Sequence, residues 1–125
     1  MPPEPHPARA AIEAGDVDPL TALLAEDVVF RSPAVYRPYQ GRDTVIALLR
    51  VVASVFENFR YADEWRDGRT TILFFEANVG DRELQGIDIL EENDAGRIET
   101  FTVMIRPLSG LQTLAAAVAA RVGAA

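Results

Sequence analysis

The first half of the chain carries apolar residues at the spacing of helices. This pattern predicts three short elements, namely helices over residues 8–14 and 20–25 and a strand over residues 28–30. A longer helix is expected after Asp43 or Thr44, either of which can cap its first turn. Its apolar face comprises Val45, Leu48, Leu49, Val52 and Phe56. The segment 32–41 before this helix is rich in proline and tyrosine, which predicts a loop.

The second half of the chain changes to the alternating pattern of β-strands. Strands are predicted over residues 59–66, 69–79, 82–92 and 97–106. The joints between them are short and contain glycine, which is typical of tight hairpins, so consecutive strands should pair antiparallel. A final helix is expected over residues 108–122, after Pro107. This order predicts an α+β fold in which helices pack against one face of a curved antiparallel sheet.

Length, composition and charge place limits on the class of protein. With 125 residues, 49% hydrophobic and 25% charged, the chain resembles a single globular domain over residues 1–125. Residues 1–7 are rich in proline and are expected to form a flexible tail. The net charge of −7 argues against nucleic acid and membrane as partners, because nucleic acid and anionic membranes are bound through clustered basic residues. No apolar run approaches the ~20 residues of a membrane-spanning helix, and no signal-peptide core is seen, so we expect a cytoplasmic protein.

Several kinds of chemistry are excluded by the residue types that are missing. The chain has no cysteine, which excludes thiolate nucleophiles and disulfides. All 12 basic residues are arginine, which excludes Schiff-base chemistry on lysine. The single histidine, His6, lies in the predicted tail, so neither a Ser-His-Asp arrangement nor a histidine metal site is expected. Since a glycine-rich phosphate loop is missing too, we predict no metal and no cofactor.

Asp88 is the strongest candidate for a functional residue. It stands in the middle of the apolar strand Gly86–Leu90. Because an ionised carboxylate is costly to bury, Asp88 must reach water, find a partner or hold a proton. One interpretation is an acid or base in a pocket, or an anchor for a ligand oxygen. The other is a structural residue on a wet face or paired with an arginine, for which Arg31, Arg37 and Arg106 are the candidates.

A set of short motifs also gives the chain a family resemblance. In order, they are Ala14–Asp18, Leu23–Pro33, Gly41–Asp43, Gly86–Asp88 and Asp94–Ile98. With this order and spacing, the chain resembles the SnoaL-like branch of the nuclear transport factor 2-like superfamily from about Ala8 to Arg106. The resemblance implies a cone, in which a strongly bent sheet wraps a long helix and leaves an apolar pocket at its open end. It also implies a homodimer formed through the outer face of the sheet.

The resemblance implies several activities, each of which requires its own residues. Asp88 falls where ketosteroid isomerases carry their oxyanion-hole carboxylic acid, but their general base is replaced by Ser32 and their tyrosine by Ala8. Limonene epoxide hydrolases need an arginine where this chain has Gly86, and an aspartate within residues 98–105. Scytalone dehydratases and SnoaL cyclases use histidines, which are missing outside the tail. We therefore do not expect any of these mechanisms in its familiar form.

The resemblance also suggests which residues surround the pocket. We predict an apolar wall of Phe30, Tyr36, Phe56, Phe101, Val103 and Ile105. Arg31 and Ser32 lie where the first strand enters the mouth of the cone and are predicted to offer hydrogen bonds there. The tyrosines of the loop 35–39 either hold a ligand or cover the end of the core, and the sequence leaves both open.

Two functions remain after these steps. The first is a small-molecule pocket protein that binds an apolar or aromatic ligand with a carbonyl or hydroxyl group. If this protein is an enzyme, we expect an isomerase, cyclase or lyase that uses Asp88 as its catalytic acid–base group. The alternative is a non-catalytic dimeric module that interacts through its sheet face. A sealed interior would favour the module, whereas an open cavity that reaches Asp88 would favour the pocket protein.

Overall fold

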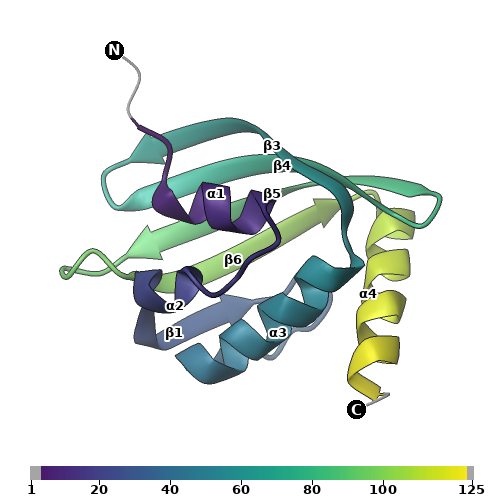
Figure 1. The fold of residues 1–125 in the computed structure, drawn as a ribbon, viewed down its shortest axis with the longest axis horizontal. Coiled ribbons are helices and arrows are strands. Elements are labelled where there is room, and N and C mark those ends of the chain that lie inside the picture. Colours follow the sequence, from purple (N-terminus) through teal and green to yellow (C-terminus); the bar gives the residue numbers. More distant parts are fainter. Residues whose placement is uncertain (1–3, 124–125) are drawn as a thin grey trace.

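The computed structural model describes residues 4–123, and within them six strands form one bent, open sheet (Figure 1). The strands are β1 (Leu24–Arg31), β2 (Tyr39–Gln40), β3 (Glu57–Asp67), β4 (Thr70–Val79), β5 (Arg82–Glu92) and β6 (Ile98–Arg106). Their order in the sheet is β2-β1-β6-β5-β4-β3, with β1 and β6 parallel and all other neighbours antiparallel. The α+β class is confirmed, and the hairpin strands β3 to β6 follow the sequence prediction closely.

The helices are α1 (Pro7–Glu13), α2 (Leu20–Leu23), α3 (Arg42–Val55) and α4 (Leu108–Gly123). Figure 1 shows α1, α2 and α3 against one side of the sheet, while α4 stands at one end of the strands beside α3. None of the helices within residues 4–123 is long and apolar enough to cross a membrane. The helices of residues 4–123 therefore cover one face of the sheet, its inner face, and leave the other face open.

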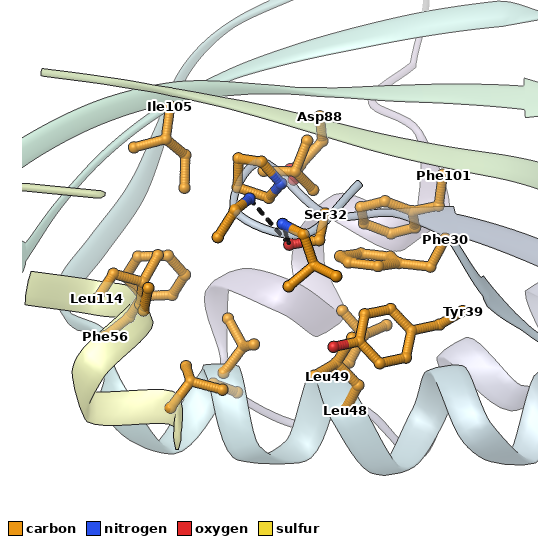
Figure 2. Close-up of a pocket in the computed structure, with 18 of the residues that line it drawn as sticks. Phe30, Ser32, Tyr39, Leu48, Leu49, Phe56, Asp88, Phe101, Ile105 and Leu114 are labelled. Atoms are coloured by element: carbon orange, nitrogen blue, oxygen red, sulfur yellow. Dashed lines mark hydrogen bonds between the residues drawn. The ribbon is translucent and has the colours of Figure 1, made fainter. Parts of the chain in front are cut away.

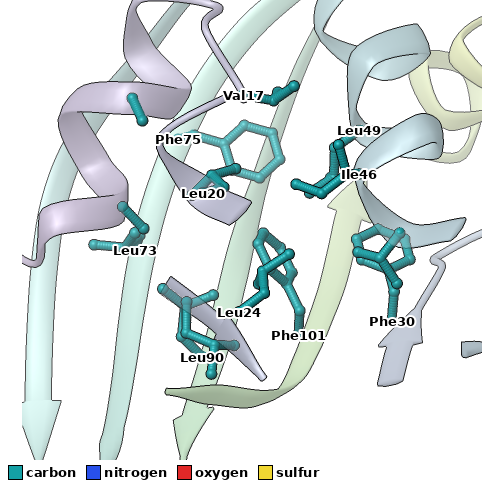
Figure 3. Close-up of a cluster of buried hydrophobic side chains, with 14 of the residues drawn as sticks. Val17, Leu20, Leu24, Phe30, Ile46, Leu49, Leu73, Phe75, Leu90 and Phe101 are labelled. Carbon is teal, nitrogen blue, oxygen red and sulfur yellow. The ribbon is translucent and has the colours of Figure 1, made fainter. Parts of the chain in front are cut away.

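Strand alternation builds the core between these layers. Along β4 the buried residues alternate with half-buried ones, so that Leu73 and Phe75 point inward from the same strand. Figure 3 shows these side chains meeting Leu90 and Phe101 from β5 and β6 and Leu20 from α2. Each such side chain contributes about 1.5–3 kcal/mol when it is removed from water. The inner face of the sheet is thereby fixed against the helices.

The boundary between α2 and β1 differs from the sequence prediction. The helix expected over residues 20–25 ends at Leu23, and Leu24 and Ala25 already belong to β1. Leu24 pairs with Ile98 of β6, and both side chains are buried. Pairing and burial in the sheet outweigh the weak helix preference of so short a segment.

The segment before α3 also differs in two details. The short strand β2 lies within the predicted loop and pairs with β1. Neither Asp43 nor Thr44 caps α3, because the helix begins at Arg42 and its N-cap is Gly41, with φ at +93° and no side-chain hydrogen bond. Asp43 instead lies in the first turn, where its negative charge is favourable to the helix dipole.

His6 is held against the sheet, whereas we expected it in a flexible tail. Its side chain is only 5% exposed, and Nε2 lies 2.9 Å from Oε1 of Glu92 on β5. Its Nδ1 accepts a hydrogen bond from the main-chain N–H of Ala8 and so caps α1. The contact with Glu92 ties His6 to the sheet, and the cap gives the first turn of α1 an acceptor for one of its free N–H groups.

Candidate functional site

A cavity of about 540 Å³ lies between the inner face of the sheet, α3, α4 and the loop after β1. Figure 2 shows Phe30 and Phe101 on one side of it, Leu48 and Leu49 of α3 below, and Leu114 of α4 on the opposite side. Its lining is apolar apart from Ser32, Tyr39 and Asp88, as far as residues 4–123 are concerned. Its volume is within the range of small-molecule sites.

The two helices line the cavity through regular apolar faces. From α3 come Leu48, Leu49, Val52, Ala53 and, just past its end, Phe56. From α4 come Leu111, Leu114, Ala115, Val118, Ala119 and Val122. Both sets follow the three- and four-residue spacing that places side chains on one side of a helix. The strand β6 adds Phe101, Val103 and Ile105 by its two-residue alternation.

Asp88 lies on the wall of this cavity, in the middle of β5, opposite Leu73 of β4 and Val103 of β6. Its side chain is 5% exposed. Its Oδ2 accepts a hydrogen bond of 2.5 Å from the hydroxyl of Tyr61. Burial raises the pKa of Asp88 from 3.8 to about 7, although the hydrogen bond from Tyr61 acts in the opposite direction. Its neutral and charged forms are therefore both populated near neutral pH.

The partner of Asp88 is a tyrosine and not one of the arginines that we considered. Within residues 4–123, no arginine forms an ion pair with Asp88, and Arg106 instead donates to Oε1 of Gln85 at 2.8 Å. Burial and the nearby Asp88 carboxylate raise the pKa of Tyr61 well above its ordinary value. Tyr61 therefore keeps its proton and acts as a hydrogen-bond donor.

Tyr61 was not predicted from the sequence, because the register of the strands that connects it with Asp88 is known only from the folded sheet. Tyr61 pairs with Phe75, and Phe75 pairs with Gly86, which is two residues from Asp88 on the same strand. A tyrosine at an inward position of β3 can thus reach Asp88 across β4. Gly86 leaves no empty space beside the carboxylate, because a Cβ there would lie 2.4 Å from Cζ of Phe75.

Most of the other predicted site residues line the cavity, but two do not. Those that line it are Phe30, Ser32, Phe56, Phe101, Val103 and Ile105. Arg31 is exposed on the side of β1 opposite to Phe30 because strand residues alternate between faces. Tyr36 is fully exposed, at 103%, in the loop before β2. The loop contributes Pro33, Ala34 and Val35 to the lining, and β2 contributes Tyr39.

Ser32 is a second polar group at the cavity. Its Oγ accepts hydrogen bonds from the main-chain N–H groups of Ala34 and Val35, at 3.0 and 3.3 Å (Figure 2). Because these bonds use the lone pairs of the oxygen, the hydroxyl hydrogen is left to donate. No group of three or more His, Cys, Asp or Glu residues that could hold a metal ion is found within residues 4–123.

A bent, open sheet with helices on its inner face and an apolar cavity defines the nuclear transport factor 2-like class of folds. The chain belongs to the SnoaL-like domain family, whose model matches residues 8–106. No curated protein matches the chain significantly.

Solved structures agree with this assignment. A steroid delta-isomerase from Pseudomonas aeruginosa is 44% identical, with a TM-score of 0.88 over 92% of this chain and 85% of that one. A protein with a cystatin-like fold from Silicibacter pomeroyi is 38% identical, with a TM-score of 0.88 over 91% and 81% of the two chains. A nuclear transport factor 2-like protein from Mesorhizobium loti is 17% identical and shares the fold, with a TM-score of 0.72 over 80% and 85%.

Proposed function

We propose that this protein binds a neutral, largely apolar small molecule whose carbonyl or hydroxyl oxygen is hydrogen-bonded by Asp88. The observation that carries this proposal is the position of Asp88 on the wall of an apolar cavity. Tyr61 holds one carboxyl oxygen, Oδ2, and no partner for Oδ1 is found within the described part of the chain. A neutral Asp88 can therefore donate a hydrogen bond from Oδ1 to a ligand oxygen.

The lining favours a neutral ligand over an anionic one. Among residues 4–123, no arginine lines the cavity, so a carboxylate or phosphate would lose its water without gaining a cation. A ketone, aldehyde or alcohol loses much less when it is buried. Asp88 and Ser32 then supply the few polar contacts that orient a ligand in an apolar site.

If the protein is an enzyme, we propose an isomerase, cyclase or lyase with Asp88 as its acid–base group. The similarity to the steroid delta-isomerase of Pseudomonas aeruginosa supports this class. Asp88 is the one carboxyl group in the cavity lining over residues 4–123, since Ser32 stands where the resemblance places a second. A single group must then both give and accept the proton, for which a pKa of about 7 is well suited.

The binding proposal can be tested with a bicyclic ketone and the hydrocarbon of the same shape. Binding of 2-decalone and of decalin is measured by ligand-observed NMR with wild-type protein, Asp88→Leu and the outer-face control Glu76→Gln. We expect wild type and the control to prefer the ketone by about 3- to 10-fold, the value of one hydrogen bond, and Asp88→Leu to lose that preference. Equal affinity of wild type for both compounds, or no binding of either, would refute the proposal.

The alternative is a non-catalytic dimeric module, and the cavity that reaches Asp88 supports ligand binding over it. A homodimer is compatible with both functions, and we propose one through the outer face of the sheet. Phe74, Ile87 and Met104 form an apolar row there, and Met104 is 55% exposed. Sedimentation velocity should show a dimer that Met104→Glu dissociates, and a monomeric wild type would contradict this. A cytoplasmic location stays a prediction, which cell fractionation can test.

A further inference from the structure

Helix α1 makes hydrogen bonds to both main-chain polar groups of Tyr61, its N–H and its carbonyl oxygen. The main-chain N–H of Tyr61 donates to Oε2 of Glu13 at 3.2 Å, and its carbonyl oxygen accepts a hydrogen bond from Nη2 of Arg9 at 3.2 Å. Arg9 and Glu13 lie one helical turn apart and form an ion pair of 3.4 Å with each other. The guanidinium of Arg9 also lies 5.9 Å from the centroid of the Tyr61 ring. We call Arg9 and Glu13 the α1 clamp.

The clamp acts where the sheet itself gives little support. β3 is an edge strand, with a neighbour on one side only, β4, in the described sheet. Its pairing with β4 shifts register between Glu57 and Arg60 and again between Tyr61 and Asp63. Main-chain positions at such irregularities are less firmly set by the ladder of hydrogen bonds. The side chains of α1 therefore supply contacts to Tyr61 that a second neighbouring strand would otherwise make.

The start of α1 is tied to the same strand. The main-chain N–H of His6 donates to Oε2 of Glu64 at 2.9 Å, and Nη1 of Arg9 lies 3.4 Å from the other oxygen of that carboxylate. These contacts keep the clamp in place over Tyr61. The ring of Tyr61 packs edge-on against Phe59, with centroids 5.0 Å apart. Because this packing limits rotation of the ring, a shift of the main chain would also move the hydroxyl.

We propose that Arg9 and Glu13 are positioning residues, which hold the hydroxyl of Tyr61 in hydrogen-bonding geometry with Asp88. A hydrogen bond weakens steeply when its distance or angle changes, so a loosened main chain at Tyr61 would weaken the bond to Asp88. Neither Arg9 nor Glu13 contacts the Asp88 carboxylate, and both act through the tyrosine. The role matters for function only if Asp88 is the ligand-binding group, as proposed above.

Titration of the Asp88 carboxyl group, monitored by 13C NMR, tests the positioning role without any ligand. Tyr61→Phe removes the donor and should raise the pKa of Asp88 by about 1–2 pH units. Arg9→Ala and Glu13→Ala should shift it in the same direction, by no more than Tyr61→Phe does. Glu13→Gln keeps an acceptor for the Tyr61 N–H and should restore the wild-type value. The charged groups that face Tyr61 are Arg9 and Glu13 from α1 and Asp88 from β5.

A double variant separates positioning from a general loss of structure. In a Tyr61→Phe background, Arg9→Ala should cause no further shift, since the hydroxyl through which it acts is gone. Arg50→Ala removes the exposed ion pair between Arg50 of α3 and Asp18 and serves as the matched control, with no shift of the Asp88 pKa expected. If Arg9→Ala does not fold, the comparison of Glu13→Ala with Glu13→Gln decides the question.

Three outcomes would overturn the proposal. The first is that the pKa of Asp88 does not shift in Arg9→Ala or Glu13→Ala, and the second is that it shifts downward. The third is that Arg9→Ala still shifts it in the Tyr61→Phe background. A downward shift would mean that α1 mainly excludes water from Asp88. Because the readout is the carboxyl group itself, failure to bind 2-decalone would count against the proposed function and leave the positioning role standing.

Discussion

The raised pKa of Asp88 predicts that the protein loses stability as the pH rises toward neutrality. Burial moves the pKa of Asp88 from 3.8 to about 7 in the folded protein, whereas the unfolded chain keeps the ordinary value. Below both values, each state is protonated and Asp88 has no pH-dependent effect. Between them, the folded protein holds a proton that the unfolded chain has released, so the free energy of unfolding falls with pH. Above about 7 the loss is complete.

The size of this effect follows from the two pKa values. Each unit of difference corresponds to about 1.4 kcal/mol, so the full loss between about pH 4 and pH 7 is about 4 kcal/mol. Domains of this kind have total stabilities of about 5–15 kcal/mol. The effect is therefore a large fraction of the total stability and should be visible in the pH dependence of unfolding.

Urea unfolding of wild type and Asp88→Asn between about pH 5 and pH 8 measures this loss of stability. Asparagine keeps the shape of the side chain and an acceptor for Tyr61 but has no charge to lose. The stability of Asp88→Asn relative to wild type should rise by about 1.4 kcal/mol per pH unit up to about pH 7 and then level off. Glu99→Gln, on the exposed side of β6, controls for the loss of one carboxyl group. If the stability of Asp88→Asn relative to wild type did not change with pH, or rose as the pH falls, the reasoning would be refuted.

Two further predictions concern packing. Gly86→Ala should destabilise the fold by about 1–3 kcal/mol and lower the urea midpoint, because its Cβ would lie 2.4 Å from Phe75 and 2.5 Å from the main-chain oxygen of Met104; an unchanged midpoint would contradict this close packing. Ala115→Phe places a ring in the cavity from α4 and should weaken binding of 2-decalone by about tenfold or more, whereas Ala116→Phe, on the exposed side of the helix, should not. Equal affinities of the two variants would show that the ligand binds elsewhere.

The sheet and the position of Asp88 could be predicted from sequence because both depend on local pattern. β4 alternates buried and half-buried residues along its whole length, and glycine-containing joints set the hairpins. An aspartate in the middle of an apolar strand stands out against such a pattern. The apolar stripe of α3 was predicted for the same reason, and Leu48, Leu49 and Val52 from it line the cavity.

The environment of Asp88 could not be predicted, since it depends on residues that only the folded sheet brings together. Tyr61 is 27 residues away and reaches Asp88 across β4. His6 looked like part of a free tail because its acceptors, Glu64 and Glu92, lie 58 and 86 residues from it, and pattern analysis does not detect contacts at that range. The end of α2 was placed too late because the partner that draws Leu24 into the sheet lies on β6.

The cost of burying Asp88 is itself an argument that the residue serves a ligand. At neutral pH its burial without a cation costs about 4 kcal/mol, and this cost remains although the hydrogen bond from Tyr61 already lowers the pKa of Asp88. Two apolar side chains of similar shape would avoid the cost and leave no donor without a partner. Tyr61→Phe/Asp88→Leu should therefore be more stable than wild type at about pH 8 in urea unfolding, and should lose the preference for 2-decalone over decalin. If the double variant were less stable, Asp88 and Tyr61 would contribute to the fold, and a structural role would explain them without a ligand.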